Sequence, residues 1–220
     1  MYNKFQKFNG DKIPDIIEYV KSHLEKNPTS TITVGCDSVQ GRRKTMYAIS
    51  LMIYDQDIRR GAHVVFFRES CPKIRFIQER LYKEAQYLND VGEYMNEKLG
   101  EFYKRLDLTD LERRRYKYHL LKSQGLYSDV KKHNEHGVLS NLILTEEDRL
   151  DFKLVDLHAD FNPFPGLSNK NKSNQSYKSY IPWLRSLGFR VWCKPESAAA
   201  STASDLLLKN KKKEDYKNRI

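Results

Sequence analysis

Cysteine is scarce in this sequence: three occur among 220 residues, Cys36, Cys71 and Cys193. No two of them form a Cys-x-x-Cys pair, so the chain lacks the spacing of a disulfide framework. His133-Asn-Glu-His136 has metal-like spacing but no second ligand pair, so a zinc site is disfavoured and carboxylates are the candidate metal ligands. We therefore expect a reduced intracellular protein without structural disulfides.

Long apolar runs are also missing. No window of the sequence approaches the length and hydrophobicity of a membrane span, and the N-terminal residues 1–7 have no apolar signal core. No internal repeat or low-complexity tract is present. These absences predict a cytoplasmic location and no membrane partner.

Acidic residues are outnumbered by basic ones, 29 to 39, which gives a net charge of +10 and a pI of about 9.3. An excess of positive charge favours polyanionic partners. With 39% hydrophobic residues and a mass of 26.0 kDa, the chain can form one well-packed domain with an elaboration.

The hydrophobic pattern predicts an α/β fold. Period-2 and continuous apolar runs predict strands, and steps of three and four predict helices. Short connections make the first three strands an antiparallel meander. After a first helix over 14–24, the predicted order is βββαβαβα, with strands over 31–36, 44–54, 62–68, 152–159 and 189–193 and helices over 72–95, 180–187 and 196–209.

Two segments fall outside this plan. Residues 97–150 are highly charged and only weakly periodic, which predicts a helical insertion. Residues 210–220 form a basic tail that we expect to be mobile. The remaining residues, 1–96 and 151–209, would form the main domain.

One residue breaks the apolar stripe of the long helix. Glu84 stands among Leu81, Leu88 and Val91, on the face that should pack against the core. A carboxylate there is costly unless a positive group lies opposite, and a metal ion is the candidate. Three further acidic residues can be presented beside it by the sheet and the last helix: Asp37, Asp160 and Asp205.

Three motifs carry a resemblance to a known family: Val34-Gly-Cys-Asp-Ser-Val-Gln40, Leu157-His-Ala-Asp160 and the stretch from Lys194 to Asp205. With the predicted element order, they resemble the ribonuclease H-like superfamily and, within it, the YkuK family. The resemblance covers about residues 8–96 and 151–209. It implies a five-stranded mixed sheet of three antiparallel and two parallel strands, flanked by helices.

The superfamily implies phosphodiester hydrolysis with Mg²⁺ or Mn²⁺. Two-metal hydrolysis needs carboxylates around two ions about 4 Å apart, and Mg²⁺ prefers oxygen ligands. Asp37 would bridge both ions, Glu84 and Asp160 would complete one site, and Asp205 the other. Each residue also has an ordinary explanation: Asp37 and Asp160 as turn formers, Glu84 at the edge of its stripe, and Asp205 on a solvated face.

Other residues are candidates for supporting roles. His158 shares a strand face with Asp160 and can orient a ligand or the attacking water, although a hydrogen-bonded core histidine is the simpler interpretation. Ser38, which follows Asp37, is a candidate for the same role. Two basic groups can hold phosphates, or can equally be solvated surface residues: Arg42, Arg43 and Lys44, and Arg113, Arg114 and Arg115.

The sequence thus predicts a metal-dependent nuclease, with a non-catalytic module that binds nucleic acid or protein as the alternative. RNA, RNA–DNA hybrid and branched DNA remain open as substrates, and the oligomeric state is not predicted. A proofreading exonuclease is disfavoured, because Asp37 is followed by Ser38-Val39 rather than by Asp-x-Glu. Asp156 lies four residues before Asp160, about 13 Å away along a strand, so we expect it to be structural.

Overall fold

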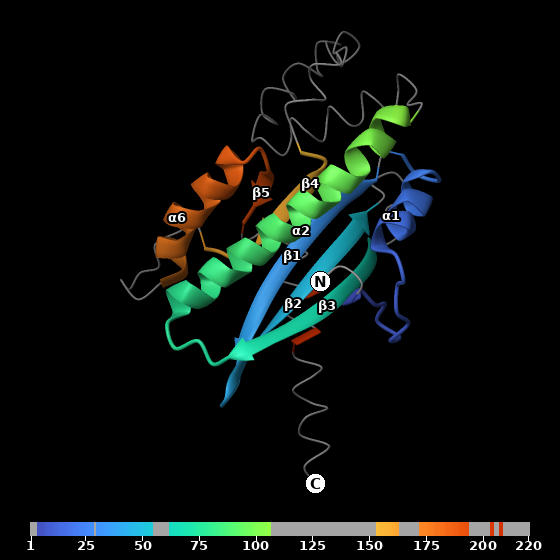
Figure 1. The fold of residues 1–220 in the computed structure, drawn as a ribbon. Helices are drawn as coiled ribbons and strands as arrows, with labels where there is room; N and C mark the ends of the chain where they lie inside the picture. Colours follow the sequence, from blue (N-terminus) through green and yellow to red (C-terminus); the bar gives the residue numbers. More distant parts are fainter. Residues whose placement is uncertain are drawn as a thin grey trace, which may run out of the picture.

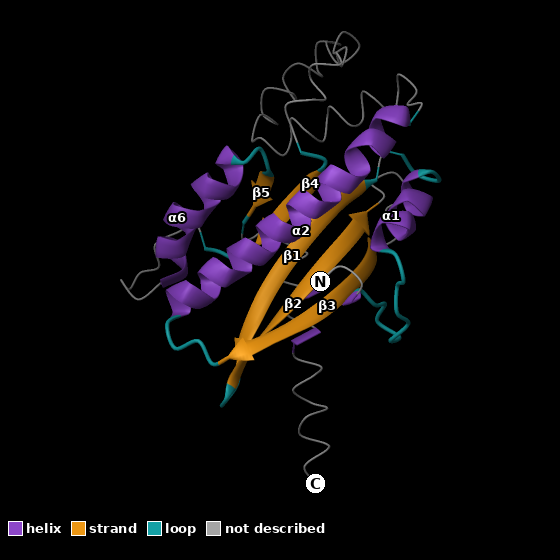
Figure 2. Ribbon diagram, in the orientation of Figure 1, coloured by secondary structure: helices purple, strands orange, loops and turns teal. Residues whose placement is uncertain are grey.

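The computed structural model of the protein describes residues 4–28, 30–54, 62–106, 153–162, 172–193, 203–204 and 207–208. These residues form a five-stranded mixed sheet with helices packed on it (Figures 1 and 2). The elements are α1 (Ile16–Leu24), β1 (Thr31–Gln40), β2 (Lys44–Tyr54), β3 (Ala62–Pro72), α2 (Ile77–Arg105), β4 (Val155–Ala159), α6 (Lys172–Ser186) and β5 (Arg190–Trp192).

The strand order is β3-β2-β1-β4-β5. β1, β2 and β3 pair antiparallel, whereas β4 pairs parallel to β1 and β5 parallel to β4. The predicted fold class and element order are therefore confirmed through β5. The helices α2 and α6 make the parallel pairing possible, because the chain must return to the same end of the sheet before the next parallel strand can begin.

One face of the sheet is covered by helices. α2 crosses it diagonally between α6 and α1 (Figure 1). Alternating residues of β1 and β4 supply the sheet side of this core, for example Val34, Cys36 and Leu157, all fully buried. The opposite face carries a smaller cluster of Met46, Ala48, Phe66, Leu207 and Leu208.

The long helix differs from its prediction at both ends. Pro72 ends β3, residues 73–76 form a loop, and α2 begins at Ile77. The helix then continues to Arg105, with Leu99 fully buried and Tyr103 nearly so. The apolar stripe therefore extends beyond Met95, and the predicted boundary at residue 97 falls inside α2.

β1 is longer than predicted. The expected end at Cys36 reflects the poor strand propensity of Asp, but the strand continues to Gln40 because residues 37–40 pair with residues 45–48 of β2. Asp37 is thus inside a strand rather than at its end. β3 is also longer than predicted, β4 and β5 are shorter, and α6 begins earlier.

Several predicted features lie outside the described residues: Asp205, Arg113, Arg114, Arg115, the segment 107–150 and the tail 210–220. No described helix combines the length and the apolar composition that a bilayer crossing needs.

Candidate metal-binding active site

Glu84 faces the core from the middle of α2. It is 2% exposed, although its neighbours on the same stripe, Leu81 and Leu88, are apolar. The Ser38 hydroxyl of β1 donates a hydrogen bond to Glu84 Oε1. Glu84 Oε2 is buried and has no hydrogen-bond partner among the described residues. Glu84 Oε2 is therefore available to bind a ligand, such as the metal ion that the sequence predicts.

The surroundings of Glu84 disfavour its negative charge. Burial, followed by the negative charge of Asp37, raises the pKa of Glu84 from its usual 4.5 to about 8. The hydrogen bond from Ser38 and the positive charge of Arg80 lower this pKa, and Asp160 raises it further. Three predicted ligands thus interact electrostatically. A divalent cation bound among them would displace the proton from Glu84 and lower the pKa of this carboxyl.

Asp37 and Asp160 are brought together by the parallel ladder. The last pair of that ladder is Cys36 with Ala159, so Asp37 is the next residue of β1 and Asp160 is the first residue after β4. Neighbouring strands lie about 4.8 Å apart, which places the two backbones side by side. Both aspartates are partly exposed, whereas Glu84 is buried behind them.

The end of β4 opens the sheet at this point. β4 ends at Ala159, which pairs with Cys36, but β1 continues for four more residues to Gln40. The edge of β1 beyond Cys36 is therefore not paired with β4, and Asp37 on it is partly exposed. Carboxylates around such a notch are suitable oxygen ligands for Mg²⁺ or Mn²⁺.

Within the described part of the chain, no three His, Cys, Asp or Glu side chains already converge on one metal position. Asp205, the fourth predicted ligand, is outside that part. The unpartnered oxygen of Glu84 is compatible with a bound cation, which would also offset the cost of its buried negative charge. Asp37, Glu84 and Asp160 are the described residues that can hold it.

Residues on either side of Asp205 contact the second face of the sheet. The Ser204 hydroxyl lies 2.9 Å from that of Ser50, and Arg68 donates a hydrogen bond to the Leu207 carbonyl at 2.9 Å. Ala48, the pairing partner of Asp37, belongs to the same cluster as Leu207. Because paired residues in an antiparallel ladder point to the same side, Asp37 faces this side of the sheet.

Asp156 lies deeper in the sheet and has protein partners. Its two carboxylate oxygens accept hydrogen bonds from Arg190 Nε at 2.6 Å and from Trp192 Nε1 at 3.0 Å, both on β5. Its side chain and that of Arg190 are about nine-tenths buried. This ion pair agrees with the structural role expected for Asp156.

His158 and Ser38 flank the carboxylates from β4 and β1. His158 is 8% exposed, and burial lowers its pKa to about 4, so its ring is neutral at physiological pH. The ring lies edge-on to Trp192, with centroids 6.3 Å apart. The Ser38 hydroxyl donates a hydrogen bond to Glu84, so Ser38 contacts one of the predicted ligands.

The predicted basic residues of the hairpin lie at the surface. Arg42, Arg43 and Lys44 are all exposed at the connection between β1 and β2. Two residues that act on the site were not predicted. Arg80 lies one turn before Glu84, and its Arg-x-x-x-Glu spacing was the available signal. Cys36 is buried beside the acidic residues, and burial, then Glu84 and Asp37, raises the pKa of its thiol.

Comparison with known proteins identifies a family for this chain. A family model described as ribonuclease H-like matches residues 12–209, which is most of the chain. Neither a curated protein nor a solved structure gave a significant match. The matched range includes all five strands and the three described helices, together with the acidic residues discussed above.

Proposed function

The chain belongs to the ribonuclease H-like family, and from this premise we propose that it is a metal-dependent nuclease that hydrolyses phosphodiester bonds in nucleic acid. Family membership supports a role connected with nucleic acids. The hydrolytic activity and its dependence on Mg²⁺ or Mn²⁺ are our inference from the residues. The closer resemblance to the YkuK family remains a prediction within this assignment.

Glu84 is the observation on which the proposal rests. A carboxyl that is 2% exposed, has one oxygen without a described partner and is repelled by the charges of two aspartates lowers the stability of the protein at neutral pH. Such an arrangement is typical of a functional site, where the requirements of the chemistry outweigh those of folding. A purely structural position would favour an apolar residue in this stripe.

Each residue of the proposed site has a distinct role. Mg²⁺ or Mn²⁺, held by Asp37, Glu84, Asp160 and Asp205, would activate a water molecule and stabilise the leaving oxygen. The Ser38 hydroxyl fixes the orientation of Glu84. Neutral His158 can hydrogen-bond to a ligand or to the attacking water, but its low pKa makes it a poor proton donor at pH 7.

The substrate class follows from charge and family. A net charge of +10 favours a polyanion, and RNA, RNA–DNA hybrid and branched DNA are the candidates. Recognition of a 2′-hydroxyl can use backbone groups, so the side chains do not select among them. A panel of these labelled substrates, incubated with Mg²⁺, Mn²⁺ or EDTA, would identify the substrate.

The decisive experiment compares three aspartates. Asp37→Asn and Asp160→Asn should each reduce metal-dependent cleavage by at least about a hundredfold, because each removes a charged ligand. Asp156→Asn should keep most of the activity and lose stability, because it weakens the buried pair with Arg190. Initial rates and thermal melts of the three variants provide the measurements.

The matched control in this experiment is Asp156→Asn, which makes the same chemical change within β4, four residues before Asp160. Normal turnover by purified Asp37→Asn would exclude a nuclease site at this position. A wild-type protein that binds the substrates but does not cleave them would instead be a non-catalytic ribonuclease H-like module.

A further inference from the structure

We propose that the loop between β3 and α2, together with the tip of the β1–β2 hairpin, binds single-stranded nucleic acid beside the carboxylates. This inference rests on the proposed function for the class of ligand. The surface is defined by Lys73, Arg75, Phe76, Tyr82 and Lys83, which we call the loop patch. It would hold the part of the substrate that flanks the scissile bond.

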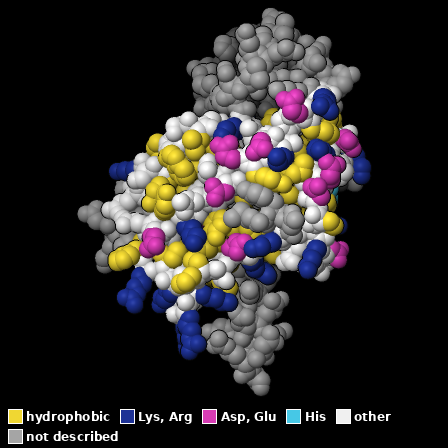
Figure 3. Space-filling model, viewed as in Figure 1, with side chains coloured by type: hydrophobic (Ala, Val, Ile, Leu, Met, Phe, Trp, Pro, Cys, Tyr) yellow, Lys and Arg dark blue, Asp and Glu magenta, His cyan; other side chains and the backbone are white. Residues whose placement is uncertain are grey.

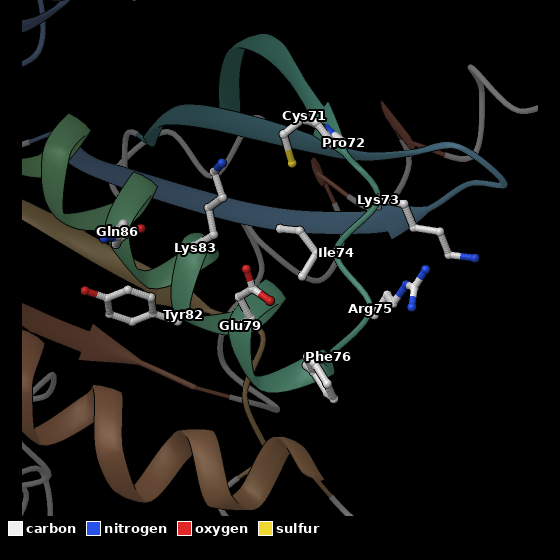
Figure 4. A pocket seen from close by; sticks show the side chains of 10 residues that line it. All are labelled: Cys71, Pro72, Lys73, Ile74, Arg75, Phe76, Glu79, Tyr82, Lys83 and Gln86. Carbon is white, nitrogen blue, oxygen red and sulfur yellow. The ribbon is translucent and has the colours of Figure 1, made fainter.

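The loop patch lines a pocket of about 670 Å³ where β3 leads into α2. Figure 4 shows Lys73 and Arg75 extending on the same side of the loop, with Phe76 farther along it and Lys83 and Tyr82 on the helix. A pocket of this size can take a nucleotide, since ligand sites commonly measure about 300–1,000 Å³.

Positive charge dominates this end of the molecule. Lys73 and Arg75 are exposed, as are Arg42, Arg43 and Lys44 on the adjacent hairpin, and none of the five forms an ion pair within the described residues. Figure 3 shows Lys and Arg gathered at the lower end, where Figure 1 places the hairpin tip and the loop. Glu79 is the acidic residue that lines the pocket. Phosphates are the complementary ligand.

Exposed aromatic rings accompany the charge. Phe76 is 73% exposed and Tyr82 is 42% exposed, and these are two of the three large hydrophobic residues that the described chain exposes. Tyr82 lies 5.4 Å from Tyr180 of α6, ring centroid to centroid. An exposed ring beside cations is the arrangement that stacks unpaired bases while the cations hold the backbone. Bases inside a duplex are already stacked and cannot use it.

The loop is held in place before any ligand binds. The backbone N–H of Lys73 donates to the Arg43 carbonyl at 3.1 Å, and that of Ile74 donates to Thr45 Oγ1 at 3.0 Å. The Gln40 side-chain amide donates to the Ile74 carbonyl. The loop and the hairpin are therefore one unit, which lowers the entropic cost of ordering a binding surface.

The loop patch is separated from the carboxylates by only a few residues along α2 and, at the hairpin that holds the loop, along β1. Lys83 is the residue before Glu84, and Phe76 lies eight positions before it, about 12 Å along the helix. On β1, Gln40 is three residues beyond Asp37, about 10 Å along the strand. A strand bound at the carboxylates would therefore reach the loop patch within a few nucleotides.

An acidic protein is a less suitable occupant. It would complement the cations, but it would give Phe76 no planar partner, whereas a nucleic acid satisfies both features. We therefore expect binding to depend on the aromatic ring as well as on the charge, and these two contributions can be measured separately.

The first test measures the charge contribution. Fluorescence anisotropy with a labelled oligothymidine, in EDTA to prevent cleavage, should show that Lys73→Glu/Arg75→Glu weakens binding at least about tenfold and lowers the salt slope by more than about 1. The control is Lys12→Glu/Lys98→Glu, which makes the same charge change at two exposed positions outside the loop patch. Its affinity should fall by less than threefold.

The second test measures stacking. Phe76→Ala should weaken single-strand binding about five- to thirtyfold and leave duplex affinity within twofold, while Phe76→Tyr restores single-strand binding. In Phe76→Trp, the added indole should be quenched by the oligothymidine. Phe76 is exposed, so none of these changes should affect folding, and thermal melts check this.

Equal affinities of the charge-reversed variant and its control would overturn the proposal and favour a protein partner at the loop patch. An equal loss of duplex and single-strand binding in Phe76→Ala would also overturn it. These outcomes are independent of the nuclease assignment, because binding is measured in EDTA. Cleavage that persists without loop-patch binding would refute this inference alone, and binding without cleavage would refute the nuclease alone.

Discussion

The raised pKa of Glu84 links the stability of the protein to pH and, if the proposed metal site exists, its metal affinity as well. Its pKa of about 8 in the folded state exceeds the usual 4.5, so the folded protein binds a proton more tightly than the unfolded chain. The stability associated with this proton is complete below about pH 4.5 and is lost as the pH rises through about 8. A divalent cation displaces the proton, so metal binding should strengthen over the same pH range.

We predict that Glu84→Gln stabilises the metal-free protein at about pH 8.5 by on the order of 2 kcal/mol, because the neutral amide removes the cost of a buried charge. At about pH 5, where Glu84 is mostly protonated, the variant and the wild type should have similar stabilities. Urea unfolding in EDTA at both pH values measures these differences.

The same titration in excess Mg²⁺ tests the ligand role. Wild-type protein should gain more stability from Mg²⁺ at the higher pH, and Glu84→Gln should gain little at either pH. A wild-type protein whose stability in EDTA does not fall between these pH values would contradict the raised pKa. An undiminished Mg²⁺ effect in the variant would remove Glu84 from the site.

At the scale of elements, the position of α2 fixes the distance between Glu84 and the strands. Gly92 is a point of close approach: a Cβ at this position would lie 2.8 Å from Phe189 Cε1 and 3.0 Å from Leu157 Cδ2. The absence of a side chain at Gly92 lets α2 pack closely on β4 and on Phe189 next to β5. Glu84 lies two turns earlier on the same helix and depends on this contact for its position.

We predict that Gly92→Ala lowers the free energy of unfolding by about 1 kcal/mol, because overpacking outweighs the gain in helix propensity. Gly100→Ala is the control within the same helix: apart from its own stretch of helix, no described residue lies within 4 Å of its added Cβ, so stability should rise by about 0.5 kcal/mol. Urea unfolding compares the two. Equal stabilisation of both variants would mean that the Phe189 ring moves aside freely.

At the scale of the whole molecule, the net charge of +10 would attract the proposed nucleic-acid substrate before it reaches the proposed site. The tail 210–220 and the run Arg113–Arg115 contribute to this charge, and their role remains a prediction from the sequence. Charge of this kind affects affinity and association rate rather than the chemical step.

Removing Lys211–Ile220 and neutralising Arg113–Arg115 should weaken nucleic-acid binding and lower its salt slope by about 1 or more, with little change in turnover at saturating substrate. Changing Arg113–Arg115 to lysine keeps the charge and should preserve binding. Binding isotherms at several salt concentrations, with initial rates, provide the data. Unaltered affinity and slope would favour a protein partner for these segments.

The sequence by itself determined the fold class, the element order and the position of Glu84 in a buried stripe. These features are local: hydrophobic periodicity is a property of neighbouring residues, and short connections allow only antiparallel pairing of the first three strands. The structural role of Asp156 was also predictable. Strand geometry alone places it too far from Asp160 to share a metal site, which leaves an ion pair as the ordinary explanation for a buried carboxylate.

Only the tertiary structure decided that β1 continues past Asp37, that the ladder ends at Cys36 and Ala159, and that the loop 73–76 is tied to the hairpin. Each depends on hydrogen bonds to residues distant in the sequence. The poor strand propensity of Asp37 is outweighed by its pairing with Ala48 of β2. Pro72 belongs to β3 rather than to the following helix, because it pairs with Lys44 at the start of β2. Local patterns carry no record of such partners, since register is fixed only when strands meet.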